Sequence, residues 1–303
     1  MSDAMGGANA ATIATTAPAV NEQHLPRVQR RRHFKSVVAN AMITLFAGFA
    51  ILPLILVFSY IARAGLPALN LDFFYKLPAP AGELGGGMAN AITGSVLMVV
   101  LSGVMAIPPG LLCGLYVAEF PHQKLARVLR FVIDLMTGVP SIVIGLFAYA
   151  VLVVPMGGFN AWAGSAALAI IMLPIVSRTT EEILRLIPAQ LREAGLALGL
   201  PRWKVLLRLI MRAGRSAIAT GVFLAIARAS GETAPLLFTS FNNQYWTRSL
   251  SEPVASLPVQ IYTYAISPYE EWHRLAWAGS LVLVSVVFAI NLLSRLLLKR
   301  GAK

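Results

Sequence analysis

Residues 178–237 read RTTEEILRLIPAQLREAGLALGLPRWKVLLRLIMRAGRSAIATGVFLAIARASGETAPLL and join two unlike segments. The first is strongly basic and amphipathic, which is typical of an element that docks on another protein. The second is an apolar helix that carries Arg228 and Glu232, and so places opposite charges inside a membrane span. This combination predicts a protein that couples an external source of energy to a pathway for a charged solute.

The composition is that of an integral membrane protein. Of the 303 residues, 57% are hydrophobic and only 13% are charged, whereas soluble domains have about 25% charged residues. The net charge of +12 does not indicate nucleic-acid binding, because the basic residues flank apolar runs as membrane topology requires. One cysteine, Cys113, excludes a disulfide within the chain, and four scattered histidines argue against a metal site.

The apolar runs predict an all-α fold with six transmembrane helices, because a spanning helix needs about 20 apolar residues. A permease domain over 37–298 would follow a disordered cytoplasmic tail, 1–36, and precede a short cytoplasmic end, 299–303. The fourth span is short and ends near Pro174 and Arg178. The six predicted spans are 37–62, 91–117, 130–154, 161–177, 214–240 and 275–298.

The distribution of Lys and Arg predicts the orientation. With the N-terminus inside, 20 of the 25 basic residues fall on the inner side, four on the outer side, and Arg228 within a span. Both termini are therefore expected in the cytoplasm. The outer segment 241–274 is rich in Tyr and Trp, which indicates an interfacial aromatic belt, a docking surface for an external partner, or both.

The inner loop, 178–213, is predicted to contain short helices. Thr179 or Thr180 could cap the first helix, which Pro188 ends. A second helix is expected from Ala189 to Leu198, with Gly199 as its left-handed terminator. Pro201 would occupy the first position of a third helix that runs to Met211. Such a loop either lies on anionic lipid or docks on a partner.

Arg228 is the leading candidate for a pathway residue. It is predicted near the middle of the 214–240 helix, where an ionised Arg costs at least about 2.5–3.5 kcal/mol in lipid. Glu232 follows four residues later, so the two form either a self-satisfied ion pair or an anion site. The guanidinium geometry suits an oxyanion. Small residues at 217, 221 and 225 predict that this helix packs closely on another.

Three further features have two interpretations each. Arg178 is either a second basic pathway residue or a positive-inside anchor. Pro140-Ser141 either simply kinks the third span or breaks it and offers a hydroxyl to the pathway. Asp134 lies four residues after Arg130, a spacing that favours a local ion pair.

Two groups of motifs carry a resemblance to a known family. Glu193-Ala194-Gly195, three residues, Gly199, nine residues and Leu209-Ile210-Met211 resemble the EAA loop of ABC importer permeases. The chain departs from that family at Met211-Arg212, where Leu-Pro is usual. The string from Ala227 to Leu237 resembles PstA-type permeases of phosphate importers. Further strings of that branch are Gly138–Val143, Leu257-Pro258-Val259, Ser267-Pro268, Glu271-Trp272 and Leu275–Gly279.

The resemblance implies a type I ABC importer permease in a bacterial inner membrane. By matching position Arg228 and Glu232 would belong to the substrate pathway, and Arg178 and Ser141 are further candidates from their own places in the sequence. The implied partners are a homologous PstC-like permease, two PstB-like ATPase subunits and a periplasmic PstS-like phosphate-binding protein. The residues implied in coupling to the ATPase are Glu193, Ala194, Gly195, Gly199, Leu200 and Pro201.

The chain itself is expected to bind no cofactor and to catalyse no reaction. It has no G-x-x-x-x-G-K-[S/T] loop, so ATP would be used by the partner ATPase. Three alternatives remain at this point: a permease for sulfate, molybdate or phosphonate; an ATP-independent secondary transporter or channel; and a non-transporting scaffold or sensor.

Overall fold

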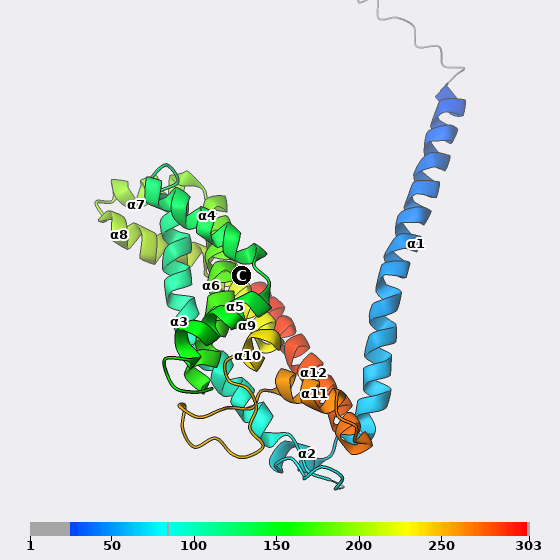
Figure 1. The fold of residues 1–303 in the computed structure, drawn as a ribbon. Coiled ribbons are helices and arrows are strands. Elements are labelled where there is room, and N and C mark those ends of the chain that lie inside the picture. Colours follow the sequence, from blue (N-terminus) through cyan, green and yellow to red (C-terminus); the bar gives the residue numbers. More distant parts are fainter. Residues whose placement is uncertain (1–24, 84, 302–303) are drawn as a thin grey trace, which may run out of the picture. The chain divides into compact units, whose positions relative to one another are not determined.

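The computed structural model describes residues 25–83 and 85–301, and every regular element in them is a helix (Figure 1). Five of these helices are long and apolar enough to cross a membrane, or up to six if one sharply bent pair counts as a single span. The all-α membrane fold predicted from the apolar runs is therefore confirmed. The chain divides into two compact units, Met1–Phe58 and Ser59–Lys303.

The first unit consists, in its described part, of helix α1, Leu25–Gly65, as far as Phe58. Its large apolar side chains, among them Leu45, Phe46 and Phe49, are exposed on the chain, as lipid contact requires. The prediction of a disordered tail over 1–36 was wrong for residues 25–36, which are helical. The remainder of that predicted tail, 1–24, lies outside the described residues.

The second unit is built around helix α6, Ala161–Leu186, which packs along α3, Ala89–Glu119. Helix α9, Met211–Ser230, packs on α6, and α12, Glu270–Gly301, packs on α9. Met98 of α3, Met172 of α6 and Ala225 of α9 belong to one buried cluster between these helices. From Ala161 to Val176, helix α6 carries almost only apolar residues, as expected of a helix that other helices surround.

A row of small residues lets α9 approach α6, as its spacing predicted. A Cβ added to Gly221 would lie only 2.2 Å from Cγ2 of Thr179 on α6. Ala225, one turn further on, is completely buried. The backbones of the two helices therefore meet at a distance that larger side chains would prevent.

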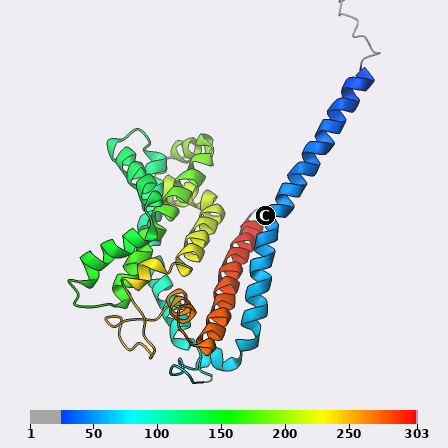
Figure 2. The same ribbon diagram turned by 45° about the vertical axis from the view of Figure 1, so that its right-hand side comes forward.

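The predicted third span, 130–154, is two helices joined at a sharp bend. Helix α4, Lys124–Gly138, and helix α5, Ser141–Ala148, meet at 105°, and α5 continues as the π-helix η2, Tyr149–Val153 (Figures 1 and 2). Val139 has an extended backbone, and Pro140 offers no amide hydrogen to the turn before it. The helix is therefore broken at Pro140, and the interpretation of Pro140 as a simple kink was wrong.

The fourth and fifth predicted spans also have different bounds. Helix α6 continues through Pro174 and past Arg178 to Leu186, so Thr179 and Thr180 lie inside a helix and cap none. The fifth span starts with α8, Arg202–Lys204, and the π-helix η3, Val205–Ile210, which lead into α9. It ends at Ser230 instead of residue 240, and a short helix, α10, Ala234–Leu237, follows.

The second unit contains another buried core, around Tyr264. It contains the 3-10 helix η1, Leu66–Ala68, helix α2, Leu71–Tyr75, and helix α11, Leu257–Ala265. Tyr264 packs there with Phe73, and its ring stacks on that of Trp272 at 4.6 Å. These two aromatics of the segment 241–274 therefore stabilise the fold. The exposed members of the set are Tyr245, Trp246, Tyr262 and Tyr269.

Candidate functional site

A cavity of 150 Å³ lies among α4, α5, α6 and α9, and Arg228 and Ser141 both line it. Two of the four predicted pathway residues, 87 positions apart in the sequence, are therefore brought together by the fold. The other lining residues are apolar except for one hydroxyl: Met136, Thr137, Val139, Ile144, Ile171, Pro174 and Ile175.

Arg228 occupies the last turn of α9, not the middle of a longer helix as predicted. Its Nε lies 3.5 Å from Oε1 of Glu232, so the expected ion pair is present. The pair is asymmetric, because 59% of the Arg228 side chain is exposed but only 14% of the Glu232 side chain. The guanidinium forms no hydrogen bond with another described side chain, which leaves N–H groups free for a ligand.

Glu232 reaches Arg228 because α9 stops just before it. The backbone turns after Ser230, where the amide of Gly231 donates to the Arg228 carbonyl and that of Glu232 to the Ala229 carbonyl. Pro235 then lies in the first turn of α10, a position that suits proline. The backbone therefore leaves α9 next to the Arg228 guanidinium, and the turn brings the Glu232 carboxylate within reach of it.

Two breaks in the helical backbone meet beside this cavity. Helix α5, which follows the break at Pro140, packs against α10, which follows the break at Gly231. The contact is close, since a Cβ added to Gly145 would lie 2.7 Å from Cα of Pro235. Non-helical backbone at membrane depth is tolerated where it is buried in protein or lines a cavity, and broken helices often form transport sites.

The chemistry of the cavity suits an anion. Arg228 supplies a permanent positive charge with several donors, Ser141 a hydroxyl, and none of the lining residues is acidic. Among residues 25–83 and 85–301, no three His, Cys, Asp or Glu side chains are grouped as a metal site would require. An oxyanion that accepts two parallel hydrogen bonds from Arg228 fits the donors present.

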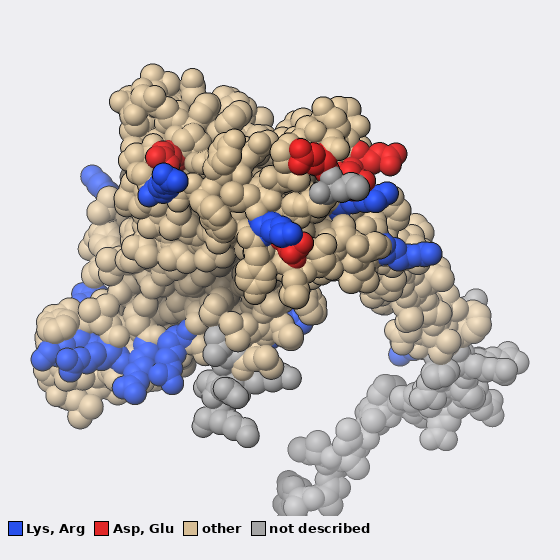
Figure 3. Space-filling view, turned by 90° about the horizontal axis from the view of Figure 1, so that it is seen from below, with Lys and Arg blue, Asp and Glu red and all other residues tan. Residues whose placement is uncertain are grey.

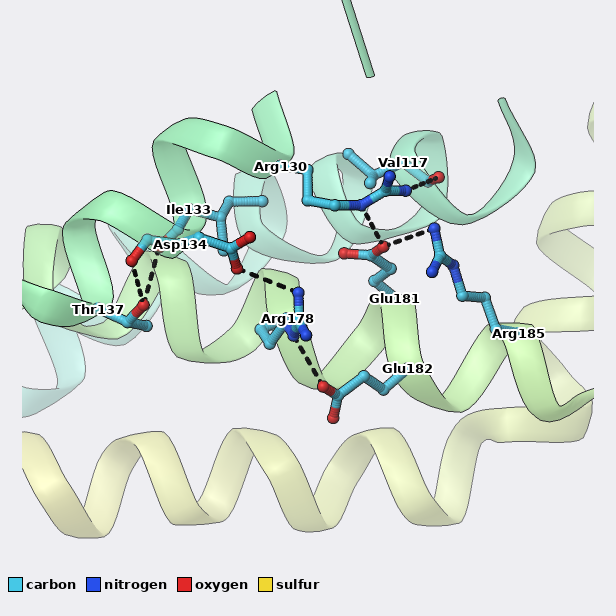
Figure 4. Close-up of polar contacts among 9 residues, drawn as sticks. All are labelled: Val117, Arg130, Ile133, Asp134, Thr137, Arg178, Glu181, Glu182 and Arg185. Carbon is cyan, nitrogen blue, oxygen red and sulfur yellow. Dashed lines mark hydrogen bonds and ion pairs between the residues drawn. The ribbon is translucent and has the colours of Figure 1, made fainter. Parts of the chain in front are cut away.

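Arg178 does not line the cavity with Arg228. Its NH1 atom lies 3.1 Å from Oδ1 of Asp134 on α4, and its Nε lies 2.7 Å from Oε1 of Glu182 (Figure 4). Both pairs are partly exposed, at the end of α6 that leads into the inner loop. The prediction of a local Arg130–Asp134 pair was wrong, because Asp134 points across to α6.

A buried carboxylate beside these pairs was missed in the sequence. Glu181 is 1% exposed and accepts from Nε of Arg130 at 2.8 Å, while NH2 of Arg185 lies 2.9 Å from the same oxygen (Figure 4). Arg130 and Asp134 are both on α4, so two ion pairs join α4 to α6. The acidic residues of 178–237 were a signal, but only the packing selects their partners.

The predicted coupling residues form a helix and its terminator. Helix α7 runs from Ala189 to Ala197, close to the predicted bounds. Gly199 has φ +77°, the left-handed conformation expected of it. The amide of Leu200 donates to the carbonyl of Gly195, and that of Gly199 to Leu196, which together are a Schellman motif. Pro201 precedes α8, one position earlier than expected.

The two faces of α7 differ. Gly195 is buried, and a Cβ there would lie 2.7 Å from Cδ1 of Leu209 in η3. Glu193 and Ala194, in contrast, are exposed. Large apolar side chains are also exposed on and beside this helix: Leu186, Leu191, Leu196 and Leu198. A helix that packs on one side and presents leucines on the other is suited to docking.

An arginine ties α7 to the spans. Nε of Arg192 lies 2.8 Å from Oε1 of Glu119, the last residue of α3. Its other nitrogens donate to the carbonyls of Leu184, at 3.1 Å, and Ile187, at 3.1 Å. These carbonyls belong to the C-terminal end of α6, where a cation is favourable. Arg192 therefore joins α7 to both α3 and α6.

Known proteins share both the sequence and the fold of this chain. A family profile described as "Binding-protein-dependent transport system inner membrane component" matches residues 110–302. "Phosphate transport system permease protein PstA" of Yersinia pestis is 44% identical over 269 residues, which cover 88% of this chain and 90% of that protein. The protein of the same name from Xylella fastidiosa (strain 9a5c) is 48% identical over 239 residues, 78% of this chain and 83% of its own.

Solved structures agree on the architecture. A chain of the "MetNI methionine ABC transporter" in an inward-facing conformation has a TM-score of 0.61 at 17% identity, covering 71% of this chain and 96% of its own. A chain of a "bacterial alginate ABC transporter" has a TM-score of 0.61 at 14% identity, covering 92% and 99%. The fold is thus that of a type I ABC importer permease. The chain belongs to the binding-protein-dependent transport system inner membrane component family.

Proposed function

We propose that this chain is the permease subunit of an ATP-driven importer of inorganic phosphate. The proposal is supported by relatives named as phosphate transport permeases, which are 44% and 48% identical over most of the chain. The observation that carries it is the cavity in which the Arg228 guanidinium and the Ser141 hydroxyl converge at two helix breaks. The Glu232 carboxylate, which is paired with Arg228, partly neutralises the guanidinium charge. The anion is therefore bound weakly enough to be released.

The energy comes from another subunit. The exposed leucines of α7 and its left-handed terminator support docking on a cytoplasmic ATPase. By family, two such PstB-like subunits serve one importer, a homologous PstC-like permease completes the pathway, and a PstS-like protein delivers phosphate from the periplasm. The chain itself needs no cofactor. In this arrangement it lies in the bacterial inner membrane with α7 and both termini on the cytoplasmic side, as the excess of inner Lys and Arg favours.

The proposed mechanism assigns one part to each element. ATP binding draws the ATPase subunits together and displaces α7. Arg192 passes that displacement to α3 and α6, and the pairs from Arg130 and Arg178 pass it to α4. Because α4 and α5 supply one wall of the cavity and α9 supplies Arg228, the width of the cavity changes. Phosphate then alternates between outward and inward access.

The test is uptake of radiolabelled phosphate by cells that lack this chain. They are complemented with the wild type, Arg228→Gln, or the control Arg127→Gln, at matched membrane levels. Arg127 is an exposed residue of α4 that does not line the cavity, so it controls for loss of one positive charge. We expect the wild type and the control to restore uptake and Arg228→Gln to reduce it at least about a hundredfold, the scale of a lost bidentate charge contact.

Competing anions separate the alternatives. Unlabelled phosphate should abolish the signal, whereas sulfate, molybdate and a phosphonate at equal concentration should not. If one of those anions competes better than phosphate, the substrate is that anion. If uptake persists in vanadate, the importer is not driven by an ATPase. If Arg228→Gln restores full uptake, Arg228 only stabilises the helix end.

A further inference from the structure

Three arginines at the start of the fifth span line an open depression that shares no residue with the cavity lined by Arg228. Arg208, Arg212 and Arg215 surround it together with Leu207 and Met211, and its volume is 690 Å³. They are spaced by four and three residues, which places them on one face of the helix formed by η3 and α9. The three arginine side chains are exposed.

The positive charge of this depression has no internal counterion. None of its three arginines forms an ion pair with any residue in the part of the chain that the structure describes. The sequence contains no Asp or Glu between Glu193 and Glu232. By contrast, Arg130, Arg178, Arg185 and Arg192, on the neighbouring elements, are all paired with carboxylates.

The charge is part of a larger basic surface. Figure 3 shows Lys and Arg side chains gathered without acidic neighbours on the side of the molecule where α8 lies, while Asp and Glu appear elsewhere on this face. Arg202 and Lys204 of α8 add to the basic residues of this stretch. In this view no Asp or Glu of the described residues lies among these basic side chains, so an anionic partner can approach them.

Apolar side chains accompany the arginines. Leu207 and Met211 line the depression itself, and Leu207 and Trp203 are about half exposed, one helical turn apart. The Lys204 ammonium lies 5.4 Å from the centroid of the Trp203 ring. A tryptophan beside basic residues at the end of a membrane span is typical of the lipid headgroup level.

We propose that the depression formed by Leu207, Arg208, Met211, Arg212 and Arg215 binds the phosphate-bearing headgroup of an anionic phospholipid of the cytoplasmic leaflet. The arginines donate to the phosphate oxygens, and Leu207 and Met211 contact the start of the acyl chains. The proposal is independent of the transported solute. It uses only the orientation that places α7 on the cytoplasmic side.

A bound lipid fits this site better than free phosphate does. A transported ion must leave its site, which is why a single arginine tempered by Glu232 suits the pathway. Three arginines without a carboxylate would bind free phosphate tightly and release it slowly. A small hydrated ion would also make no use of the apolar side chains Leu207 and Met211.

The test uses spin-labelled phosphatidylglycerol and phosphatidylcholine. The transporter that contains this chain is reconstituted in phosphatidylcholine membranes with a trace of either label, and the motionally restricted fraction is measured by electron paramagnetic resonance. We expect the wild type to prefer phosphatidylglycerol. Each removed arginine should weaken that preference about fivefold, the scale of one basic residue at a lipid surface. The variants are Arg212→Gln and Arg208→Gln/Arg212→Gln.

The control pair Lys124→Gln/Arg127→Gln removes two exposed charges from the first turn of α4 instead. It should retain most of the preference, as should Arg208→Lys/Arg212→Lys, which preserves the charge and also reports on folding. An unchanged preference in Arg208→Gln/Arg212→Gln overturns the proposal. A second arm adds millimolar inorganic phosphate. If it displaces the labelled lipid, and radiolabelled phosphate binds to the wild type but not to this variant, the site is for free phosphate.

Discussion

Nε of Arg130 on α4 lies 2.8 Å from Oε1 of Glu181 on α6, and this contact joins two helices that both line the cavity. Arg185 approaches the same carboxylate oxygen at 2.9 Å. Further along α4, Asp134 repeats the connection through Arg178. The position of α4 relative to α6 therefore depends on side chains outside the cavity.

Glu181→Gln should destabilise the protein and impair transport. The Glu181 carboxylate is almost completely buried, but the Arg130 and Arg185 side chains left unpaired are 26% and 44% exposed, so the cost should be below the about 3–5 kcal/mol of a fully buried pair. The measurement is thermal unfolding of the solubilised transporter. Glu182→Gln is the matched control, because its pair with Arg178 is exposed and is worth about 1 kcal/mol or less. Equal effects of the two substitutions would contradict the role given to Glu181.

Glu232→Gln should slow the release of phosphate. Without the carboxylate, Arg228 attracts the anion more strongly, so KM for uptake should fall and the maximal rate should fall with it. Initial rates of phosphate uptake over a range of concentrations measure both. Glu83→Gln, in the exposed outer loop, controls for loss of one negative charge. A raised KM at an unchanged maximal rate would mean that Glu232 helps to bind the anion.

Gly221→Ala should force α9 away from α6. The new Cβ would lie 2.2 Å from Cγ2 and 2.8 Å from Cβ of Thr179, and overpacking of this kind costs about 1–3 kcal/mol. The double variant Gly221→Ala/Thr179→Ala should recover part of the lost stability, because Cγ2 and Oγ1 of Thr179, at 2.2 Å and 3.2 Å from the new Cβ, are removed while its Cβ remains. Thermal unfolding of the single and double variants forms a double-mutant cycle. Simple additivity would show that the two helices are not in contact there.

Leu198→Asp should detach the ATPase without disturbing the fold. The Leu198 side chain is 80% exposed at the end of α7, so a charge there costs little in the chain alone. In an ATPase interface the same charge would be buried, which is strongly unfavourable. Co-purification of ATPase activity with the chain measures docking. Gln190→Asp, at another exposed position of α7, is the matched control.

Much of this architecture follows from the sequence, because lipid imposes strict demands on it. Apolar length, positive charge at the inner ends and turn residues such as Gly199 are local properties, and they predicted the membrane fold and helix α7. The ends of the spans were less predictable. Helix α6 continues beyond Arg178 because its polar residues find partners on α4, a compensation that hydropathy does not measure.

The candidate site shows the same division. Arg228, Glu232 and Ser141 were recognisable as unusual residues in apolar surroundings, and a charge in a span needs a partner or a cavity wherever it lies. Their relation in space was not recognisable. Only the breaks at Pro140 and after Ser230, and the packing of α5 on α10, bring Ser141 to Arg228 and leave Arg178 outside.

The sequence by itself therefore determined that this chain spans a membrane, where helix α7 lies along it, and which charged side chains are costly in lipid. The tertiary structure decided which of them meet. The length of an apolar run and the residue types of a turn are properties of neighbouring residues, and so they can be recognised in the sequence. The partner of a charge such as Glu181 depends on which helices pack together, since Arg130 is 51 residues away in the sequence and 2.8 Å away in the fold.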